Sequence, residues 1–223
     1  STGLDLSKVR ARHGIVLDMG GPRGWITVQG PSQVKLRAWV HGLKAHAGCA
    51  PEEGINAIRV AAEAIAAMPL GRIDEETTAN VGVIRGGEAT NVVPDLVEVL
   101  GEARSLREGK LRLQVAEMER AFLEAASRHG ARADVDTERS YSGFKVPDDA
   151  PIVQMISQAL RHFGLEPVLV PTTGGSDANI LNEEGIQVVA ISTGMEQVHT
   201  THEFIRLSEM AFCARLVAQV LGI

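Results

Sequence analysis

Two histidines three residues apart, His199 and His202, stand next to Glu203 in a polar segment near the end of the 223-residue chain. Imidazole nitrogens and carboxylate oxygens are frequent zinc ligands in proteins. The segment follows an apolar run at residues 186–191, and open α/β sheets place ligands where such strands end. Spacing alone supports two interpretations equally: a metal site, or a hydrogen-bonded surface cluster.

A carboxylate at Asp18 closes another apolar run, residues 14–18. Glycines and a proline follow directly, so the run is typical of a buried strand with an acidic tip. A carboxylate there needs a cation or several N–H donors. The pattern therefore indicates either a cation ligand or an aspartate that stabilises the turn.

A third candidate site is the glycine pair Gly174 and Gly175, which follows an expected strand and precedes an expected helix that begins near Ser176. Small residues there leave backbone N–H groups free to face a ligand. An ordinary capped turn explains the same residues and is the simpler interpretation.

Three polar residues in the middle of the chain could contact a substrate. His46 ends an expected strand and could donate a hydrogen bond to a substrate oxygen. Asn91 offers an amide, and Arg104 a planar fork that suits a carboxylate. Their spacing alone does not distinguish these roles from ordinary surface positions.

The elements that must position these residues form two patterns. Residues 31–139 predict strand, helix, two strands, helix and strand, which suits a four-stranded antiparallel sheet with both helices on one face. Residues 1–30 and 140–223 alternate strands and helices in the manner of a parallel α/β layer. We therefore predict an α/β protein in which an α+β domain is inserted between the two parts of the other domain. The expected strands are 14–18, 25–29, 34–41, 80–84, 91–103, 131–139, 167–170 and 186–191, and the expected helices are 51–68, 107–129, 152–163, 176–184 and 208–221.

Composition narrows the classes of partner. A net charge of -6 and 4% aromatic residues disfavour nucleic-acid binding. No apolar stretch is long enough to span a bilayer, so no membrane partner is expected. Two distant cysteines, Cys49 and Cys213, suit a reducing compartment, and we expect the cytoplasm.

Taken in order, six segments resemble the zinc exopeptidase and deacylase superfamily, which includes tripeptidase T, glutamate carboxypeptidase, acetylornithine deacetylase and succinyl-diaminopimelate desuccinylase. The match is closest to tripeptidase T-like proteins. Each segment is weak alone, but six in register across nearly the whole chain are specific. They are HAGCAPEEGINA (46–57), GRIDEETTAN (71–80), GG with TN (86–87 and 90–91), EARS (102–105), GGSD (174–177) and STGMEQVH (192–199).

The resemblance implies a hydrolase of short peptides with two zinc ions, in which an inserted lid domain, 31–139, interrupts a catalytic domain, 1–30 and 140–223. It assigns Asp18 and His199 as ligands of different zinc ions, with His202 as a neighbour that orders the loop. It also implies that His46 stabilises the tetrahedral intermediate from a partner subunit, in a homodimer formed through the lid. Asn91 and Arg104, with Gly174 and Gly175, would contact the substrate.

The chain departs from the family pattern before Asp18. The family's first histidine ligand, bridging aspartate and adjacent glutamates precede that position, where almost nothing stands here, so we expect an N-terminally truncated enzyme. A catalytic zinc normally keeps three protein ligands, so we expect this chain alone to bind zinc weakly and hydrolyse nothing. Two other functions stay open: an amidohydrolase of N-acyl amino acids, and a non-catalytic dimerisation module.

Overall fold

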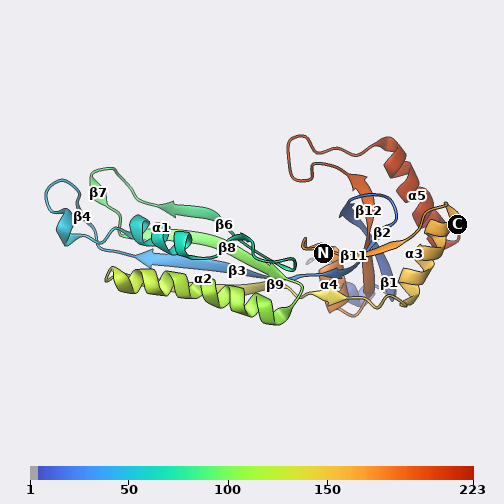
Figure 1. The fold of residues 1–223 in the computed structure, drawn as a ribbon, viewed down its shortest axis with the longest axis horizontal. Helices are drawn as coiled ribbons and strands as arrows, with labels where there is room; N and C mark the ends of the chain where they lie inside the picture. The colour runs from blue at the N-terminus through green and yellow to red at the C-terminus, as the bar shows by residue number, and fades with distance from the viewer. Residues whose placement is uncertain (1–4) are drawn as a thin grey trace. The chain divides into compact units, whose positions relative to one another are not determined.

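A computed structural model describes residues 5–223 of the chain. The chain divides into two compact units, whose elements are drawn in Figure 1. Unit 2 is Ser32–Tyr141, and unit 1 combines the chain up to Pro31 with Ser142–Ile223. A lid role for one unit and a catalytic role for the other remain predictions.

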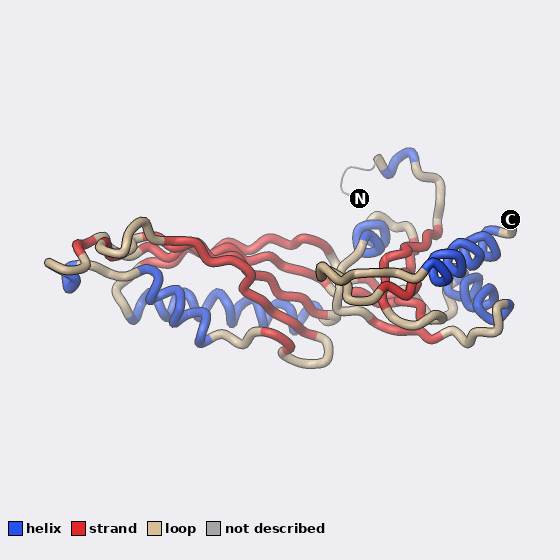
Figure 2. The backbone as a smooth tube through the Cα atoms, turned by 90° about the horizontal axis from the view of Figure 1, so that it is seen from above, coloured by secondary structure: helices blue, strands red, loops and turns tan. Residues whose placement is uncertain are grey.

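Unit 2 is an antiparallel sheet with two helices packed on one face, as Figure 2 shows. The strand order is β5-β6-β8-β3-β9, one short strand more than predicted. The extra strand, β5, pairs for only two residues at the edge of β6, in a polar stretch without an apolar alternation. The elements are β3 (Ser32–His41), β5 (Gly71–Arg72), β6 (Thr77–Gly86), β8 (Leu96–Ser105), β9 (Arg132–Tyr141), α1 (Ala57–Ala67) and α2 (Glu108–Arg128).

The helices cover the sheet because both have an apolar face at helical spacing. Val97 and Val99 alternate along β8 toward the helices, where they join one core with Leu111 and Phe122 of α2. All four side chains are fully buried. Asn56 begins α1 by accepting a hydrogen bond from the Arg59 N–H at 3.0 Å, an ordinary N-cap. This core holds the sheet rigid along its length.

Beyond one end of this sheet lies a two-stranded ladder of β4 (Ala45–His46) and β7 (Val92–Val93), close to the short 3-10 helix η2 (Pro51–Glu53). The expected strand 91–103 is therefore two strands, because Pro94 lacks an N–H and interrupts the ladder. The Pro94 carbonyl accepts a hydrogen bond from the Ala57 N–H at 2.9 Å, outside the ladder.

Unit 1 is a mixed sheet, which corrects the prediction of a parallel layer. β1 pairs in parallel with β12, and β11 pairs in parallel with β2, but β2 is antiparallel to β12 and β10. Only four residues join β1 to β2, too few for the crossover that a parallel connection needs. The elements are β1 (His13–Gly20), β2 (Trp25–Gly30), β10 (Phe144–Lys145), β11 (Val168–Pro171), β12 (Gln187–Met195), α3 (Pro151–His162), α4 (Asp177–Glu183) and α5 (Leu207–Leu221), with the 3-10 helix η1 at Leu6–Lys8. No helix within residues 5–223 is long and apolar enough to cross a membrane.

An ion-pair network joins the β5–β6 turn of unit 2 to the first turn of α2. Lys110 Nζ lies 3.0 Å from Asp74 and 2.7 Å from Glu76, and Arg107 lies 2.9 Å from Glu76. The Lys110 ammonium, followed by the Glu76 backbone N–H, lowers the pKa of Asp74 from 3.8 to about 2. The carboxylate form therefore stabilises the folded unit.

This network predicts how acid affects stability. A carboxyl group with a lowered folded-state pKa contributes fully above its ordinary value of 3.8, and that contribution is lost as the pH falls toward about 2. Asp74→Asn lacks the contribution, so its free energy of unfolding should fall less than that of the wild type across this window. Denaturant titrations at a series of pH values measure the difference. Asp136→Asn is the control, since Asp136 has no ion pair within residues 5–223; equal pH dependence in Asp74→Asn and the wild type would contradict the assignment.

Candidate functional site

Asp18 and His199 lie at the same edge of the unit 1 sheet. β1 and β12 run in parallel, with Met19 opposite Ser192 and Gly20 opposite Met195. Asp18 stands two residues before β1 ends, and His199 follows β12 by four residues. Both residues are exposed. The parallel pairing therefore brings the two predicted metal ligands to the edge where sheets of this class bind ligands.

The loop that carries His199 is held by its own hydrogen bonds. Glu196 and Phe204 pair backbone to backbone at 3.0 and 3.2 Å and close the loop. The His199 N–H donates to Glu203 Oε2 at 2.7 Å. His199 itself has a left-handed φ of 64°, which is strained for a residue other than glycine. Such strain concentrates at functional sites, and here the Glu203 carboxylate helps to maintain it.

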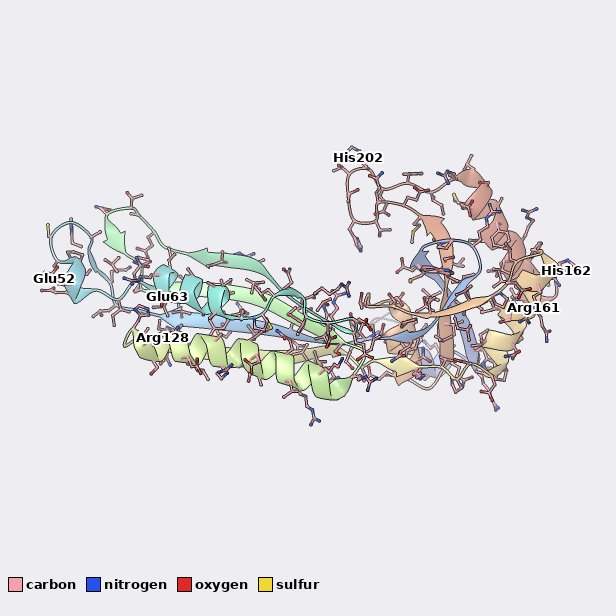
Figure 3. The ribbon with its side chains drawn as sticks, viewed as in Figure 1. Glu52, Glu63, Arg128, Arg161, His162 and His202 are labelled. Carbon is pink, nitrogen blue, oxygen red and sulfur yellow. The ribbon has the colours of Figure 1, made fainter. Side chains whose placement is uncertain are left out.

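These contacts separate the roles within the histidine and acid cluster. Glu203 bonds the backbone of His199, so it orders the loop. His202 lies on the same loop (Figure 3), where its backbone N–H donates to Thr200 Oγ1 at 3.1 Å. Within residues 5–223 no three His, Cys, Asp or Glu side chains are grouped to hold a metal ion. The cluster is therefore not a complete metal centre.

His46 is exposed in unit 2 and has a defined ring geometry. Its Nδ1 lies 3.1 Å from the backbone N–H groups of both Gly48 and Cys49, which donate to it. A nitrogen that accepts two N–H donors carries no hydrogen, so the neutral ring holds its hydrogen on Nε2. The turn after β4 thus leaves His46 with an outward-facing donor.

Asn91 lies beside His46. The Asn91 carbonyl accepts the Ala47 N–H at 3.0 Å, and His46 pairs with Val92 in the small ladder. The exposed Asn91 side chain and the His46 ring therefore belong to one end of unit 2.

Arg104 belongs to the opposite end of unit 2. It lies near the end of β8 and is half-buried, with Nη2 2.7 Å from Glu102 Oε1. Gln33 is paired with Arg104 in the ladder between β3 and β8, and its side-chain N–H donates to Oε2 of Glu102. Nε of Arg104 is buried and has no hydrogen-bond partner within residues 5–223. The guanidinium is thus oriented by Glu102 and keeps unused donors.

The length of β8 fixes the distance between these two ends. Arg104 follows Leu96 by eight residues in a continuous antiparallel ladder with β3. At about 3.4 Å per residue this spans about 27 Å, and Asn91 lies before Leu96. Within one copy of unit 2, His46 and Asn91 are therefore brought together, and Arg104 is not.

Gly174 and Gly175 are exposed in the loop that leads to α4. The Gly174 N–H donates to Thr172 Oγ1 at 3.0 Å. Ser176 caps α4 in a reciprocal pair with Asn179, whose buried side-chain amide also donates to the carbonyls of Pro31 and Ser142. The segment is an ordinary capped turn, and substrate contact by the glycines remains a prediction.

Two pairs near candidate residues were not assigned a role from the sequence: Glu102 with Gln33 in unit 2, and Arg23 with Glu209 in unit 1. Arg23 pairs through two nitrogens with Glu209, at 2.6 and 2.7 Å. Arg23 and Glu209 are 186 residues apart in the chain. No local pattern signals such a contact.

The ring geometry of His46 predicts one tautomer. In the neutral ring we expect hydrogen on Nε2 and none on Nδ1, because the Gly48 and Cys49 N–H groups donate to Nδ1. Two-bond proton-nitrogen correlation spectra measure this directly. His202 is the control, since its ring has no hydrogen bond within residues 5–223, and it should show a mixture of tautomers. A hydrogen on Nδ1 of His46 would refute the assignment.

Comparison with known proteins shows which family the chain resembles in sequence and fold. Residues 26–130 match the peptidase dimerisation domain of the M20 family. The Bacillus subtilis protein YqjE, which is uncharacterised, is 45% identical over 98% of this chain and 59% of its own length. The chain thus spans about three fifths of that curated relative.

Two solved structures agree with this match. The aminopeptidase PepT from Bacillus cereus is 45% identical with a TM-score of 0.84, over 98% of this chain and 59% of its own. A tripeptidase from Staphylococcus aureus is 37% identical with a TM-score of 0.90, over 98% of this chain and 58% of its own. The chain is a tripeptidase-like member of the M20 peptidases, in the zinc exopeptidase superfamily.

Proposed function

We propose that this chain belongs to a metal-dependent exopeptidase that removes the N-terminal residue from short peptides. The names of the two similar solved proteins, an aminopeptidase and a tripeptidase, support this substrate class. The observation that carries the proposal is the shared sheet edge, to which the parallel strands β1 and β12 bring the segments that carry Asp18 and His199.

The two side chains at this edge fit metal ligation. Both are exposed, and within residues 5–223 neither the Asp18 carboxylate nor the His199 ring forms a hydrogen bond. A carboxylate and an imidazole belong to the donor set that zinc takes. Asp18 would hold one zinc ion and His199 the other. Bound zinc would supply an activated water and polarise the scissile carbonyl.

Residues 5–223 bring no three such ligands together. A catalytic zinc usually keeps three protein ligands. We therefore expect further ligands and the general base to come from the part of the longer relatives that this chain does not match. The chain alone should bind zinc weakly and leave peptides intact.

The residues of unit 2 would bind and orient the substrate. The His46 Nε2–H group is a donor for the oxygen that becomes negative when water adds to the peptide carbonyl. The Asn91 amide stands beside it as a second polar contact. Arg104, held by Glu102, offers its remaining donors to the terminal carboxylate of the peptide.

One peptide cannot contact both ends of the same unit 2. A fully extended tripeptide spans at most about 11 Å, against about 27 Å along β8. We propose that two copies of the chain form a homodimer and that each site takes His46 and Asn91 from the copy that does not supply Arg104. The match of residues 26–130 to a peptidase dimerisation domain supports a second copy as the partner.

The proposal predicts the effect of removing the metal ligands. In the protein at the full length of its relatives, His199→Ala and Asp18→Asn should each weaken zinc by more than the roughly 100-fold seen when residues that only orient ligands are changed. Tripeptide hydrolysis should fall with zinc occupancy. Zinc competition with a chelating dye and hydrolysis assays measure the two effects.

His202→Ala is the matched control, because it removes an exposed imidazole from the same loop but retains the backbone N–H that donates to Thr200 Oγ1. It should keep both zinc and activity. Full activity of His199→Ala would contradict the proposal. Hydrolysis of N-acyl amino acids in preference to tripeptides would favour an amidohydrolase instead.

A further inference from the structure

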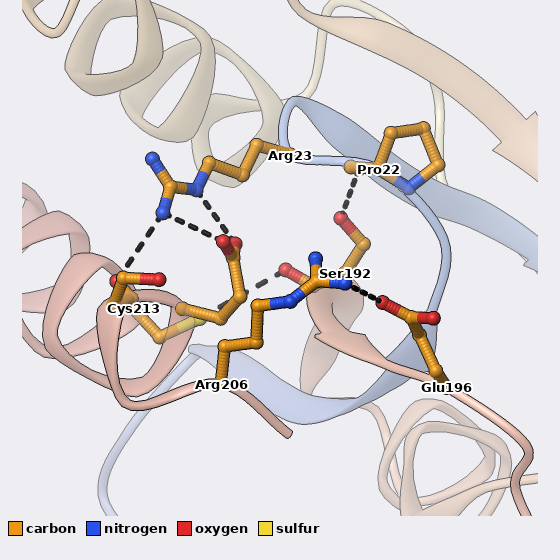
Figure 4. Close-up of polar contacts among 8 residues, drawn as sticks. Pro22, Arg23, Ser192, Glu196, Arg206 and Cys213 are labelled. Atoms are coloured by element: carbon orange, nitrogen blue, oxygen red, sulfur yellow. Dashed lines mark hydrogen bonds and ion pairs between the residues drawn. The ribbon is translucent and has the colours of Figure 1, made fainter. Parts of the chain in front are cut away.

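A group of polar contacts joins the segments that carry Asp18 and His199, between the β1–β2 turn, the end of β12 and the start of α5. Figure 4 shows the side chains that form it, among them Arg23, Ser192 and Arg206. Arg23 lies in the turn between β1 and β2, while Glu209 lies in the first turn of α5. Both line a cavity of about 560 Å³ together with Gly21, Pro22, Gly194, Met195, Glu196 and Arg206.

The Arg23 and Glu209 pair has the geometry of a strong interaction. Nε lies 2.6 Å from one carboxylate oxygen, and Nη2 lies 2.7 Å from the other. Nη2 also donates to the Ser208 carbonyl at 3.3 Å, and the guanidinium carbon lies 4.7 Å from the centre of the Phe212 ring. The Glu209 side chain is only 16% exposed. Two-point contacts of this kind restrain orientation far better than an exposed single contact.

Glu209 also rests against the end of β12. Gly194 has a φ of 73°, and a Cβ atom there would lie 2.7 Å from Cγ of Glu209. Only glycine accommodates both the conformation and the close approach. His199 follows Gly194 by five residues, so the Glu209 side chain sets where this loop leaves the sheet.

Two hydrogen bonds tie β12 to the segment after Asp18. Thr193 Oγ1 donates to the Met19 carbonyl at 3.2 Å, and Ser192 Oγ donates to the Pro22 carbonyl. Arg23 is adjacent to Pro22. The turn that follows Asp18 is therefore held on one side by β12 and on the other by Glu209.

We infer that Arg23 and Glu209 are positioning residues, which hold the Asp18 and His199 segments at the separation that the metal centre requires. This rests on the proposed function. Neither residue is a ligand, because the Glu209 carboxylate is occupied by Arg23 at both oxygens. Their effect on zinc is transmitted through the two loops.

The test compares Arg23→Gln, Glu209→Gln and the double variant in the protein at the full length of its relatives, with zinc as the probe. Each single variant should weaken zinc by about 10-fold, as changes beside metal ligands commonly do. The double variant should lose no more than either single variant, because both act through one contact. Arg37→Gln is the control, since Arg37 stacks on Trp39 and pairs with Glu98 within unit 2; its zinc affinity should not change.

A second readout needs no metal. In the 223-residue chain, Arg23→Gln should shift the amide resonances of Met19, Gly194 and His199, whereas Arg37→Gln should leave them in place. A lower melting temperature of Arg23→Gln with unchanged zinc affinity and unchanged resonances would show a purely structural pair and overturn the inference. Additive losses in the double variant would also overturn it. A wild-type protein that neither binds zinc nor cleaves tripeptides would refute the proposed function itself.

Discussion

The ten-residue ladder between β3 and β8 is the constraint on which the proposed site depends. Every residue from Ser32 to His41 is paired with one from Leu96 to Ser105, without a bulge. The core between this ladder and the two helices is buried and closely packed, which restrains its movement. A binding residue at one end therefore cannot approach a residue at the other end by local movement. Under the proposed function, a small substrate would then contact residues from two copies of the chain.

The unit 1 sheet has the opposite effect, since it brings segments that are distant in the sequence to the same edge. Asp18 and His199 are far apart in sequence, but Asp18 lies near the end of β1 and His199 follows β12, the parallel neighbour of β1. The left-handed conformation of His199, the Glu203 contact and the Arg23 and Glu209 pair then define how each segment leaves the sheet. The strands fix the position of the Asp18 and His199 segments, and the polar contacts beside the strands fix their orientation.

Much of the fold could be predicted because local periodicity carries it. The helical spacing in α1 and the alternation in β3 and β8 follow from which side chains must reach the core. The position of β12 between β1 and β2 could not be predicted, because strand order in a sheet depends on partners far away in the chain. The candidate residues were found from their types and from family resemblance. Their supporting partners, such as Glu102 for Arg104, became visible only when β3 and β8 were paired.

The central claim is that each site combines residues from two copies of the chain, and mixing two inactive variants tests it most directly. His46→Ala and Arg104→Ala are each expected to be inactive at the full length of the relatives. In a mixed dimer one site has both substitutions and the other has none. Random exchange into symmetric dimers should therefore restore about a quarter of wild-type tripeptidase activity. No recovery, with exchange verified by differently tagged copies, would contradict the shared site.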